Sequence, residues 1–141
     1  MNENRAELPK SERMLLLFGE ALTDLREAEK AKEIPGKLQR AALIFSFERA
    51  WFLGLKTLKA CLKEEGLSPL TPKQHLELAR QAGWIAPEEE DAWWILLMTG
   101  LSAAEIYEEE QAEEVKENIL SNMGALFRLH ETLKTKKQRE K

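Results

Sequence analysis

The longest periodic segment of the chain, from Lys37 to Glu65, is the feature that most constrains the fold. It contains no proline, and its apolar residues recur at intervals of three and four, the spacing of one face of an α-helix. The main stripe comprises Leu38, Ala41, Ile44, Phe47, Trp51, Leu55, Leu58 and Leu62. A second stripe comprises Ala42, Phe45 and Phe52. A helix that is apolar on two sides lies at the centre of its domain, or between the core and another subunit.

One further helix is expected before this segment and a short one after it. The first starts at Ser11, a candidate N-cap, and runs to about Lys32, where Ile34-Pro35-Gly36 ends it. Its apolar stripe comprises Met14, Phe18, Ala21, Leu22, Leu25 and Ala28. A short helix begins after Gly66, which stands where a C-terminal cap is expected. The stretch Thr71-Pro72-Lys73-Gln74 combines an N-cap, a proline at the first position and a capping-box Gln, and this helix stops at Gly83.

Two more periodic segments complete the chain. Pro87 opens a helix that passes through acidic residues to Trp93–Met98, and Thr99-Gly100 bends or ends it. The last helix is expected from about Glu108 to Lys134. Its inward residues are Val115, Ile119, Leu126, Leu129 and Leu133.

These elements predict an all-α fold, an antiparallel up-down four-helix bundle with one short extra helix. No segment alternates with a period of two over the length of a strand. A chain of 141 residues suits one domain. We expect a flexible N-terminus over 1–10, one helical-bundle domain over 11–134, and a charged, frayed tail over 135–141.

Composition and motifs exclude several classes of function. Cys61 is the single cysteine, so no intrachain disulfide or thiol-based metal cluster can form, and we expect a cytoplasmic protein. The polar first ten residues predict no signal peptide, and no apolar run reaches the roughly 20 residues of a membrane span. There is no Gly-rich phosphate loop and no G-x-S-x-G elbow. Cys61, His75 and His130 fit packing or surface roles better than catalysis, and neither a metal nor a cofactor is expected.

Charge is distributed unevenly along the chain, although the net charge is only −4, which does not favour a nucleic-acid-binding function. Between Glu88 and Glu117 there are eleven acidic residues and one base, Lys116. Such a surface repels phosphate. The long central segment carries the opposite charge on Lys37, Arg40, Arg49, Lys56, Lys59 and Lys63. This strip is either a binding site for a nucleotide phosphate or an acidic partner, with Arg40, Lys56 and Lys59 as candidates, or a solvated helix edge.

Aromatic residues provide candidates for an interface. The chain has four tryptophans, which is many for its length. Tryptophan is enriched at protein interfaces, so Trp51, Phe52, Trp93 and Trp94 are interface candidates. Their alternative role is in an ordinary core.

Residues Arg40 to Gly66 resemble the long central helix of the nucleotidyltransferase substrate-binding proteins, which are helical bundles of the HEPN superfamily. That family has an Arg, a Phe-Glu pair, a Trp-Lys-Thr-Leu-Lys stretch and a Leu-x-x-x-Gly end. The matching residues here are Arg40, Phe47-Glu48, Lys56 to Lys59 and Leu62 to Gly66, with Leu55 in place of the Trp and Trp51 one turn earlier. Leu70-Thr71-Pro72 and Ala79 to Ile85 resemble the next family segment. The resemblance covers roughly residues 12–134.

The chain departs from the family at its signature, which reads Arg-Asn, a few residues, His, one residue, Tyr and an acidic run. Gly100 stands at the Arg position, Leu101 at the Asn position and Glu105 at the His position, whereas Tyr107 and the acids match. In HEPN ribonucleases the Arg and His act on the scissile phosphate without a metal. Glycine offers no phosphate ligand, and Glu105 adds negative charge where a cation would stabilise the developing charge. The resemblance therefore implies a degenerate site, at which Glu105 and Tyr107 are the further binding candidates.

Three functions remain open. The first is a non-catalytic accessory or substrate-binding subunit that forms a homodimer and pairs with a small, separately encoded nucleotidyltransferase, with nucleotide as a possible ligand. The second is an active metal-independent ribonuclease toxin. The third is a helical protein-interaction module with no link to nucleotides. In toxin–antitoxin relatives the Tyr that corresponds to Tyr107 accepts a nucleotide from the partner, so Tyr107 is either structural or a modification site.

Overall fold

The computed structural model describes residues 2–105 and 108–141, and within them every regular element is a helix, as expected. The six α-helices of these residues are α1 Lys10–Lys30, α2 Gly36–Glu64, α3 Pro72–Gln81, α4 Glu90–Ser102, α5 Glu109–Asn122 and α6 Gly124–Arg139. Three 3₁₀ segments accompany them: η1 Asn2–Glu7, η2 Pro87–Glu89 and η3 Ala103–Glu105.

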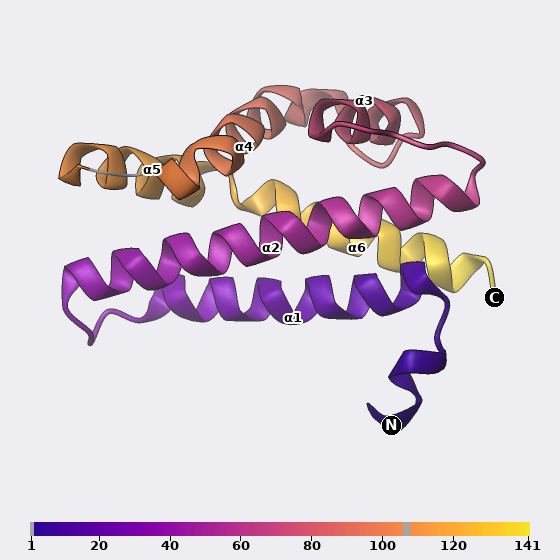
Figure 1. The fold of residues 1–141 in the computed structure, drawn as a ribbon, viewed down its shortest axis with the longest axis horizontal. Helices are drawn as coiled ribbons and strands as arrows, with labels where there is room; N and C mark the ends of the chain where they lie inside the picture. The colour runs from indigo at the N-terminus through magenta and orange to yellow at the C-terminus, as the bar shows by residue number, and fades with distance from the viewer. Residues whose placement is uncertain (1, 106–107) are drawn as a thin grey trace.

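The molecule is built along the antiparallel pair of α1 and α2, which run side by side over most of its length (Figure 1). The helices α3, α4 and α5 follow one another along the other side of α2. The last helix, α6, contacts both α1 and α2, and it brings the C-terminus close to the start of α1 (Figure 1). The long central segment of the sequence is therefore central in the fold.

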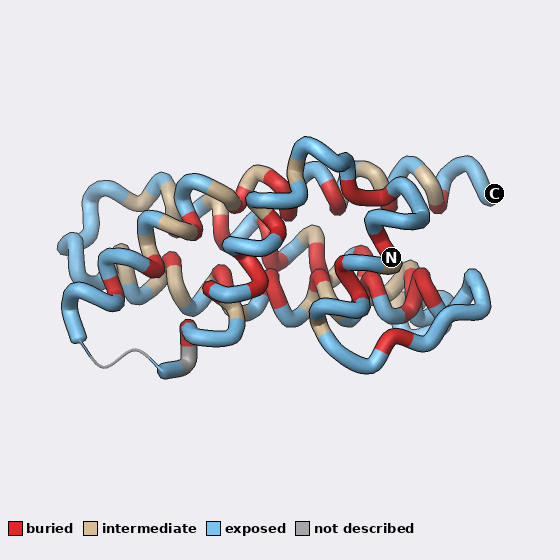
Figure 2. The backbone as a smooth tube through the Cα atoms, turned by 90° about the horizontal axis from the view of Figure 1, so that it is seen from above, coloured by how far each residue is buried: buried red, intermediate tan, exposed pale blue. Residues whose placement is uncertain are grey.

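The core lies where α1, α2, α4 and α6 face one another, and the tube in Figure 2 is coloured as buried mainly along the inner sides of the helices. Phe18, Phe47, Leu58 and Leu126 are almost completely buried there. The expected main stripe of α2 is correct for Phe47, Trp51, Leu58 and Leu62, but it is wrong at its first two residues, Leu38 and Ala41, which are exposed. Phe47 follows Leu38 by nine positions, which equals two and a half turns, so the two side chains leave α2 on opposite sides.

The last part of the chain differs most from the sequence-based expectation. A single helix from Glu108 to Lys134 is wrong, because α5 ends at Asn122 and α6 begins at Gly124. The Asn122 side chain donates a hydrogen bond to the carbonyl of Asn118 at 2.8 Å, and Gly124, a poor helix former, follows the break. Met123 is buried at the junction. The break lets α5 continue along α4 while α6 packs on α1.

Three other helix ends also differ. Ser11 is not an N-cap, because α1 begins at Lys10 after Pro9, and the Ser11 hydroxyl donates to Glu64 instead. α4 continues through Thr99-Gly100 to Ser102. α6 continues five residues past Lys134 to Arg139, and Lys137 is buried, so this part of the expected frayed tail is packed helix. In contrast, the capping box of Thr71 and Gln74 is present as the sequence predicts.

Candidate functional site

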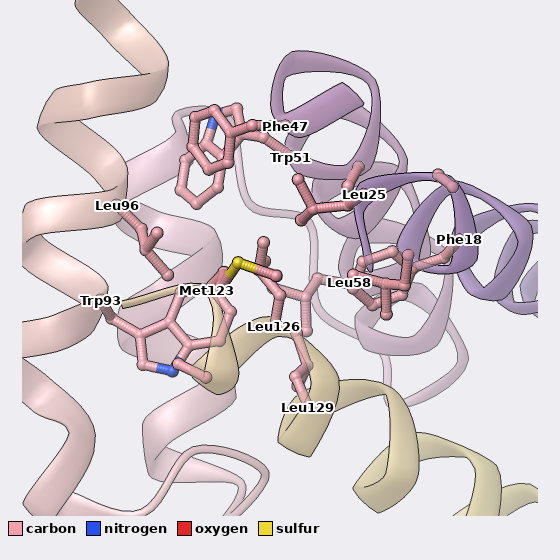
Figure 3. Packing of buried hydrophobic residues seen from close by; sticks show 14 of the residues in the cluster. Phe18, Leu25, Phe47, Trp51, Leu58, Trp93, Leu96, Met123, Leu126 and Leu129 are labelled. Atoms are coloured by element: carbon pink, nitrogen blue, oxygen red, sulfur yellow. The ribbon is translucent and has the colours of Figure 1, made fainter. Parts of the chain in front are cut away.

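The position that corresponds to the signature Arg, Gly100, packs directly against the indole of Trp51. A Cβ built at Gly100 would lie 2.7 Å from Cδ1 and from Cε2 of Trp51, and closer still to Nε1. Side chains do not make contacts that short, so α4 approaches α2 here only because residue 100 is glycine. Trp51 is itself held in place, since it stacks on Phe47 with ring centroids 6.3 Å apart and meets Trp93 at 6.4 Å (Figure 3). An arginine at position 100 would have to displace this indole.

The rest of the signature region offers no cation either. Leu101 and Glu105 are exposed, on α4 and η3 respectively. Tyr107 lies outside the described residues. Among the described residues of the signature, none carries a positive charge, and the neighbouring start of α5 is acidic at Glu109 and Glu110. The described residues of the signature therefore supply no side chain that could bind a phosphate.

Arg40 joins two helices of the fold. Its guanidinium donates to Glu113 at 2.8 Å and to Glu109 at 2.9 Å, both on α5, and Lys37 lies 3.6 Å from Glu109. The hydrogen bonds to Glu113 and Glu109 raise the pKa of Arg40, and the hydrogen bond from Arg40 lowers the pKa of Glu109. This side chain, a binding candidate from the sequence, is engaged in holding α5 to α2.

Lys56 and Lys59 lie elsewhere, on the outer face of α2. We use that name for the exposed side of the helix away from the core, which carries Leu38, Phe45, Phe52, Lys56, Lys59 and Lys63. None of the three lysines forms an ion pair within the described part of the chain, and the Lys56 ammonium lies 5.2 Å from the centroid of the Phe52 ring. Phe45 and Phe52 are 69% and 57% exposed. The basic strip expected from the sequence is thus divided, because Arg40 is paired internally while Lys56 and Lys59 are available.

The four aromatic interface candidates also fall into two groups. Trp51 and Trp93 are buried in the core, whereas Phe52 and Trp94 are exposed. Trp94 belongs to a row of large apolar residues that we call the outer stripe of α4, formed by Trp94, Ile95, Met98 and Leu101, all exposed. Sequence reasoning missed this stripe. The signal was present, since nearly every residue from Ala92 to Leu101 is apolar and a lone surface helix buries only one side.

A small hollow of about 90 Å³ lies between α3 and α4. Its walls are apolar and its rim is charged; the lining residues are Lys73, Leu76, Glu77, Arg80, Ile85, Glu90, Trp93, Trp94 and Leu97. The α3 members recur at intervals of three, four and seven residues, so they share one face of that helix. No local sequence pattern reveals this hollow, because its two walls belong to different helices and it exists only through their packing.

A comparison with protein families shows to which family this chain belongs. The model of the family described as "Nucleotidyltransferase substrate binding protein like" matches residues 15–135. The chain belongs to this family. The match runs from within α1 to within α6, and it confirms the resemblance found in the sequence. No curated protein matches the chain. None of the described helices is both long and apolar enough to pass through a membrane.

In this family member the histidines and the cysteine are packing residues. His75 is buried, with Nδ1 2.6 Å from the carbonyl oxygen of Thr71. His130 is partly buried and meets the Phe18 ring edge-on at 5.6 Å, and burial lowers its pKa. Burial raises the pKa of Cys61 to about 11, so the sulfur is a thiol at neutral pH and a poor nucleophile. Across residues 2–105 and 108–141, no three His, Cys, Asp or Glu side chains are grouped so as to hold a metal ion.

Proposed function

We propose that this protein is a non-catalytic, substrate-binding subunit that works with a separately encoded nucleotidyltransferase. The observation that carries the proposal is the family match over residues 15–135, read together with Gly100. At Gly100 the fold leaves no space for a side chain beside Trp51, so a phosphate-binding arginine is excluded without rearrangement. A family member without that cation retains binding and pairing as its functions.

The same geometry argues against a metal-independent ribonuclease. Cleavage of RNA develops negative charge on the phosphate, and a positively charged or hydrogen-bonding group must stabilise it. Gly100 supplies no such group, and exposed Glu105 opposes it. Glu105 remains a candidate binding residue through its carboxylate, and Tyr107 remains a candidate for modification by the partner.

We further propose a homodimer formed through the outer face of α2. Leu38, Phe45 and Phe52 follow one another at seven-residue intervals, so they form one exposed apolar row. Exposed rows of this size in a protein mark an interaction surface. Within each copy, we propose that the helices form an antiparallel four-helix bundle in which α5 and α6 together take the place of one helix. The cytoplasm is the expected compartment.

The outer stripe of α4 is the proposed contact for the nucleotidyltransferase. It is apolar, and acidic residues precede and follow it in the chain, at Glu88–Asp91 and at Glu105–Glu117. Its complement is a partner surface with an apolar centre and a lysine- and arginine-rich rim, because opposite potentials steer association. The stripe is also compatible with the alternative function, a protein-interaction module with no nucleotide link. The two functions differ in the partner that binds the stripe, which is a nucleotidyltransferase only in the first.

The test is co-expression with the nucleotidyltransferase encoded nearest to this chain in its genome, followed by purification through a tag on one subunit. We expect both proteins to elute together at micromolar concentration. Met98→Glu should abolish the complex, since it places a charge in the stripe. Leu70→Glu is the matched control, because Leu70 is 84% exposed and lies outside the stripe. Separate elution of the unmodified proteins would contradict the proposed pairing.

A further inference from the structure

A groove runs along one side of α6, opposite the segment 83–89 that lies between α3 and α4 in the chain. It consists of two hollows of about 610 and 460 Å³, which share Gly83, Trp84, Glu131 and Thr132. Both are open to solvent, whereas a small-molecule site encloses most of its ligand. We call this feature the α6 groove, and it shares no residue with the outer face of α2 or the outer stripe of α4.

Four side chains that carry hydrogen-bond donors follow one another along the α6 wall of the groove. They are Arg128, Thr132, Thr135 and Arg139, at intervals of four, three and four residues, so they share one side of the helix. The eleven positions from Arg128 to Arg139 make three helical turns, which places these two residues about 16 Å apart along the axis. The groove therefore has a cation at each end and hydroxyls between them.

The two arginines keep donors that no described residue uses. Arg139 is exposed and forms no ion pair with a described residue. Arg128 donates to Glu89 through Nε, and its terminal amino groups donate to no residue in the described part of the chain. A guanidinium has five N–H donors in a planar fork and binds a carboxylate through two of them at once. Each end of the groove can therefore hold one anionic group.

The middle of the groove opposes a third anionic group. Glu131 lines both hollows, is exposed, and has no ion pair within the described residues. The other two carboxylates of the lining, Glu89 and Glu140, pair with Arg128 and Lys136. A nucleic-acid strand is charged at every phosphate and would bring one of them against Glu131. The charges fit a ligand that is anionic at two points and neutral between them.

Apolar side chains line the groove between its two ends. Trp84 is largely buried there, and the Lys136 ammonium lies 5.4 Å from the centroid of its ring. Phe127, which is half-buried, and Ala86 add to this apolar lining. An extended peptide directs every second side chain to the same face, and four of its positions span about 13 Å. Side chains at the first, third and fifth positions can thus meet one arginine, the apolar lining and the other arginine, because arginine side chains are long and flexible.

We propose that the α6 groove binds an extended peptide segment of a partner protein, with acidic side chains four positions apart and an apolar side chain midway between them. The two carboxylates bind Arg128 and Arg139, and the apolar side chain packs on Trp84 and Phe127. Backbone amides of the peptide donate to Glu131. This inference does not depend on the proposed function, since none of these residues belongs to the surfaces assigned to the second copy or to the nucleotidyltransferase.

The experiment titrates a fluorescein-labelled peptide of sequence SESLSES with the full chain and follows fluorescence anisotropy. We expect a saturable rise that weakens with added salt. Arg128→Met and Arg139→Met should each weaken binding about tenfold, the effect of losing a hydrogen bond between charged groups. Lys134→Met is the matched control and should bind unchanged, because Lys134 is an exposed cation of the same helix that does not line the groove. Unchanged binding in both arginine variants would overturn the proposal.

An exchange of charges tests the contact at Arg139 directly. Arg139→Glu should lose binding of SESLSES, and one of the two peptides SKSLSES and SESLSKS should bind this variant better than it binds the unmodified protein. The peptide that does so gives the direction of the chain in the groove, and failure of both would overturn the pairing with Arg139.

Two further probes test the other parts of the ligand. SESSSES should bind more weakly than SESLSES, and equal binding would overturn the apolar contact. Hexathymidylate should bind more weakly than the peptide, because its phosphates meet Glu131. Hexathymidylate binding as tight as that of SESLSES would overturn the proposal in favour of a single nucleic-acid strand, and no saturable anisotropy change with any probe would overturn the groove as a binding site.

Discussion

At position 100, a single added methyl group is expected to destabilise the protein. Gly100→Ala places a Cβ 2.7 Å from two ring atoms of Trp51. Because Phe47 and Trp93 enclose that indole, the packing must shift, and overpacking of this kind costs about 1–3 kcal/mol. We expect a correspondingly lower free energy of unfolding in urea, followed by circular dichroism.

Gly36→Ala is the matched control for this measurement. A Cβ at Gly36, the first residue of α2, meets nothing within 4 Å. Alanine favours helix over glycine by about 1 kcal/mol, so Gly36→Ala should be neutral or stabilising. A double-mutant cycle of Gly100→Ala with Trp51→Phe should show coupling, because both changes act on one contact. If Gly100→Ala is as stable as Gly36→Ala, the close approach of α4 to Trp51 is wrong.

The environment of His130 predicts a pH dependence of stability. Burial lowers the pKa of His130 and outweighs the opposing effects of Glu131 and of a hydrogen bond with the backbone of Leu15, while Lys134 lowers the pKa further. The unfolded chain therefore binds the proton more readily, at a pKa of about 6.5. Stability is full above that pH, declines as the pH falls through it, and levels off below the folded pKa.

His130→Gln removes this titration, because glutamine carries no charge at any pH. We expect the free energy of unfolding of the variant to change less than that of the unmodified protein between about pH 7.5 and pH 5.5, above the range where most carboxylates titrate. Urea unfolding at several pH values measures both curves. Parallel curves would show that His130 is not buried as described.

At residue scale, the sequence showed which positions depart from the family pattern or carry rare aromatic residues, but it did not show the reason. The resemblance placed Gly100 at the signature Arg position from the sequence alone. The reason for the glycine is Trp51, which lies on another helix and 49 positions earlier, and no local pattern connects the two residues. For the same reason the sequence left open whether Trp51 and Trp93 lie in the core or at an interface. Only the packing of α4 on α2 places them in the core.

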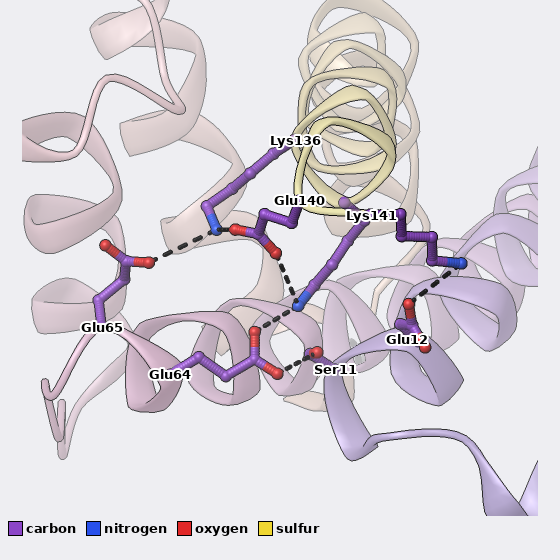
Figure 4. A network of polar contacts seen from close by, with 8 residues as sticks. Ser11, Glu12, Glu64, Glu65, Lys136, Glu140 and Lys141 are labelled. Carbon is purple, nitrogen blue, oxygen red and sulfur yellow. Dashed lines mark hydrogen bonds and ion pairs between the residues drawn. The ribbon is translucent and has the colours of Figure 1, made fainter.

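At the scale of helices, a polar network holds the end of α6 to α1 and α2 (Figure 4). Lys137 pairs with Glu64, which also accepts a hydrogen bond from Ser11 at 2.5 Å, and Lys136 lies 3.5 Å from Glu65. Partial burial would raise the pKa of Glu64, but the hydrogen bonds from Lys137 and Ser11 outweigh it and leave the pKa lowered. This part of stability is therefore present above the ordinary pKa of the carboxyl and is lost as the pH falls below it.

Lys137→Met keeps much of the apolar stem of Lys137 but removes the charge that pairs with Glu64. Because the Glu64 side chain is partly exposed, the whole molecule should lose little stability, while the last turns of α6 should open more often. Hydrogen–deuterium exchange measured by mass spectrometry should therefore speed up in the C-terminal peptide alone. Lys134→Met is the matched control, since Lys134 is exposed and forms no ion pair with a described residue. Equal exchange in the two variants would mean that the pair does not fasten α6.

The sequence predicted helices well where a start or stop signal is local. The capping box at Thr71 and the glycines at 66 and 83, both with φ of +82°, mark ends that the structure places within two residues. The division between α5 and α6 was missed, because Asn122-Met123-Gly124 interrupts no apolar stripe and contains no proline. The extension of α6 to Arg139 was missed because the partner of Lys137, Glu64, belongs to α2 and is itself held by Ser11 of α1.

At the scale of the whole molecule, the outer face of α2 suggests how two copies would pair. Its apolar row, Leu38, Phe45 and Phe52, begins near the N-terminal end of α2 and ends just past the middle, and its lysines Lys56, Lys59 and Lys63 follow toward the C-terminal end. In an antiparallel pairing about a two-fold axis at Phe45, Leu38 of one copy faces Phe52 of the other. The lysines of the two copies then point away from each other, so like charges stay apart. A parallel pairing would bring them together and is disfavoured.

This arrangement predicts the mass and its response to substitution and salt. Light scattering should give a dimer, and Phe45→Glu should give a monomer, because two carboxylates would meet at the two-fold axis without a partner. Leu70→Glu should remain dimeric, as it adds the same charge at a site away from α2. Added salt should not dissociate the dimer, since the contact is apolar and the lysines lie outside it. A monomeric mass at high concentration would refute the homodimer, and dissociation in salt would refute the apolar contact. Neither result bears on the pairing with the nucleotidyltransferase, because its proposed contact is the outer stripe of α4.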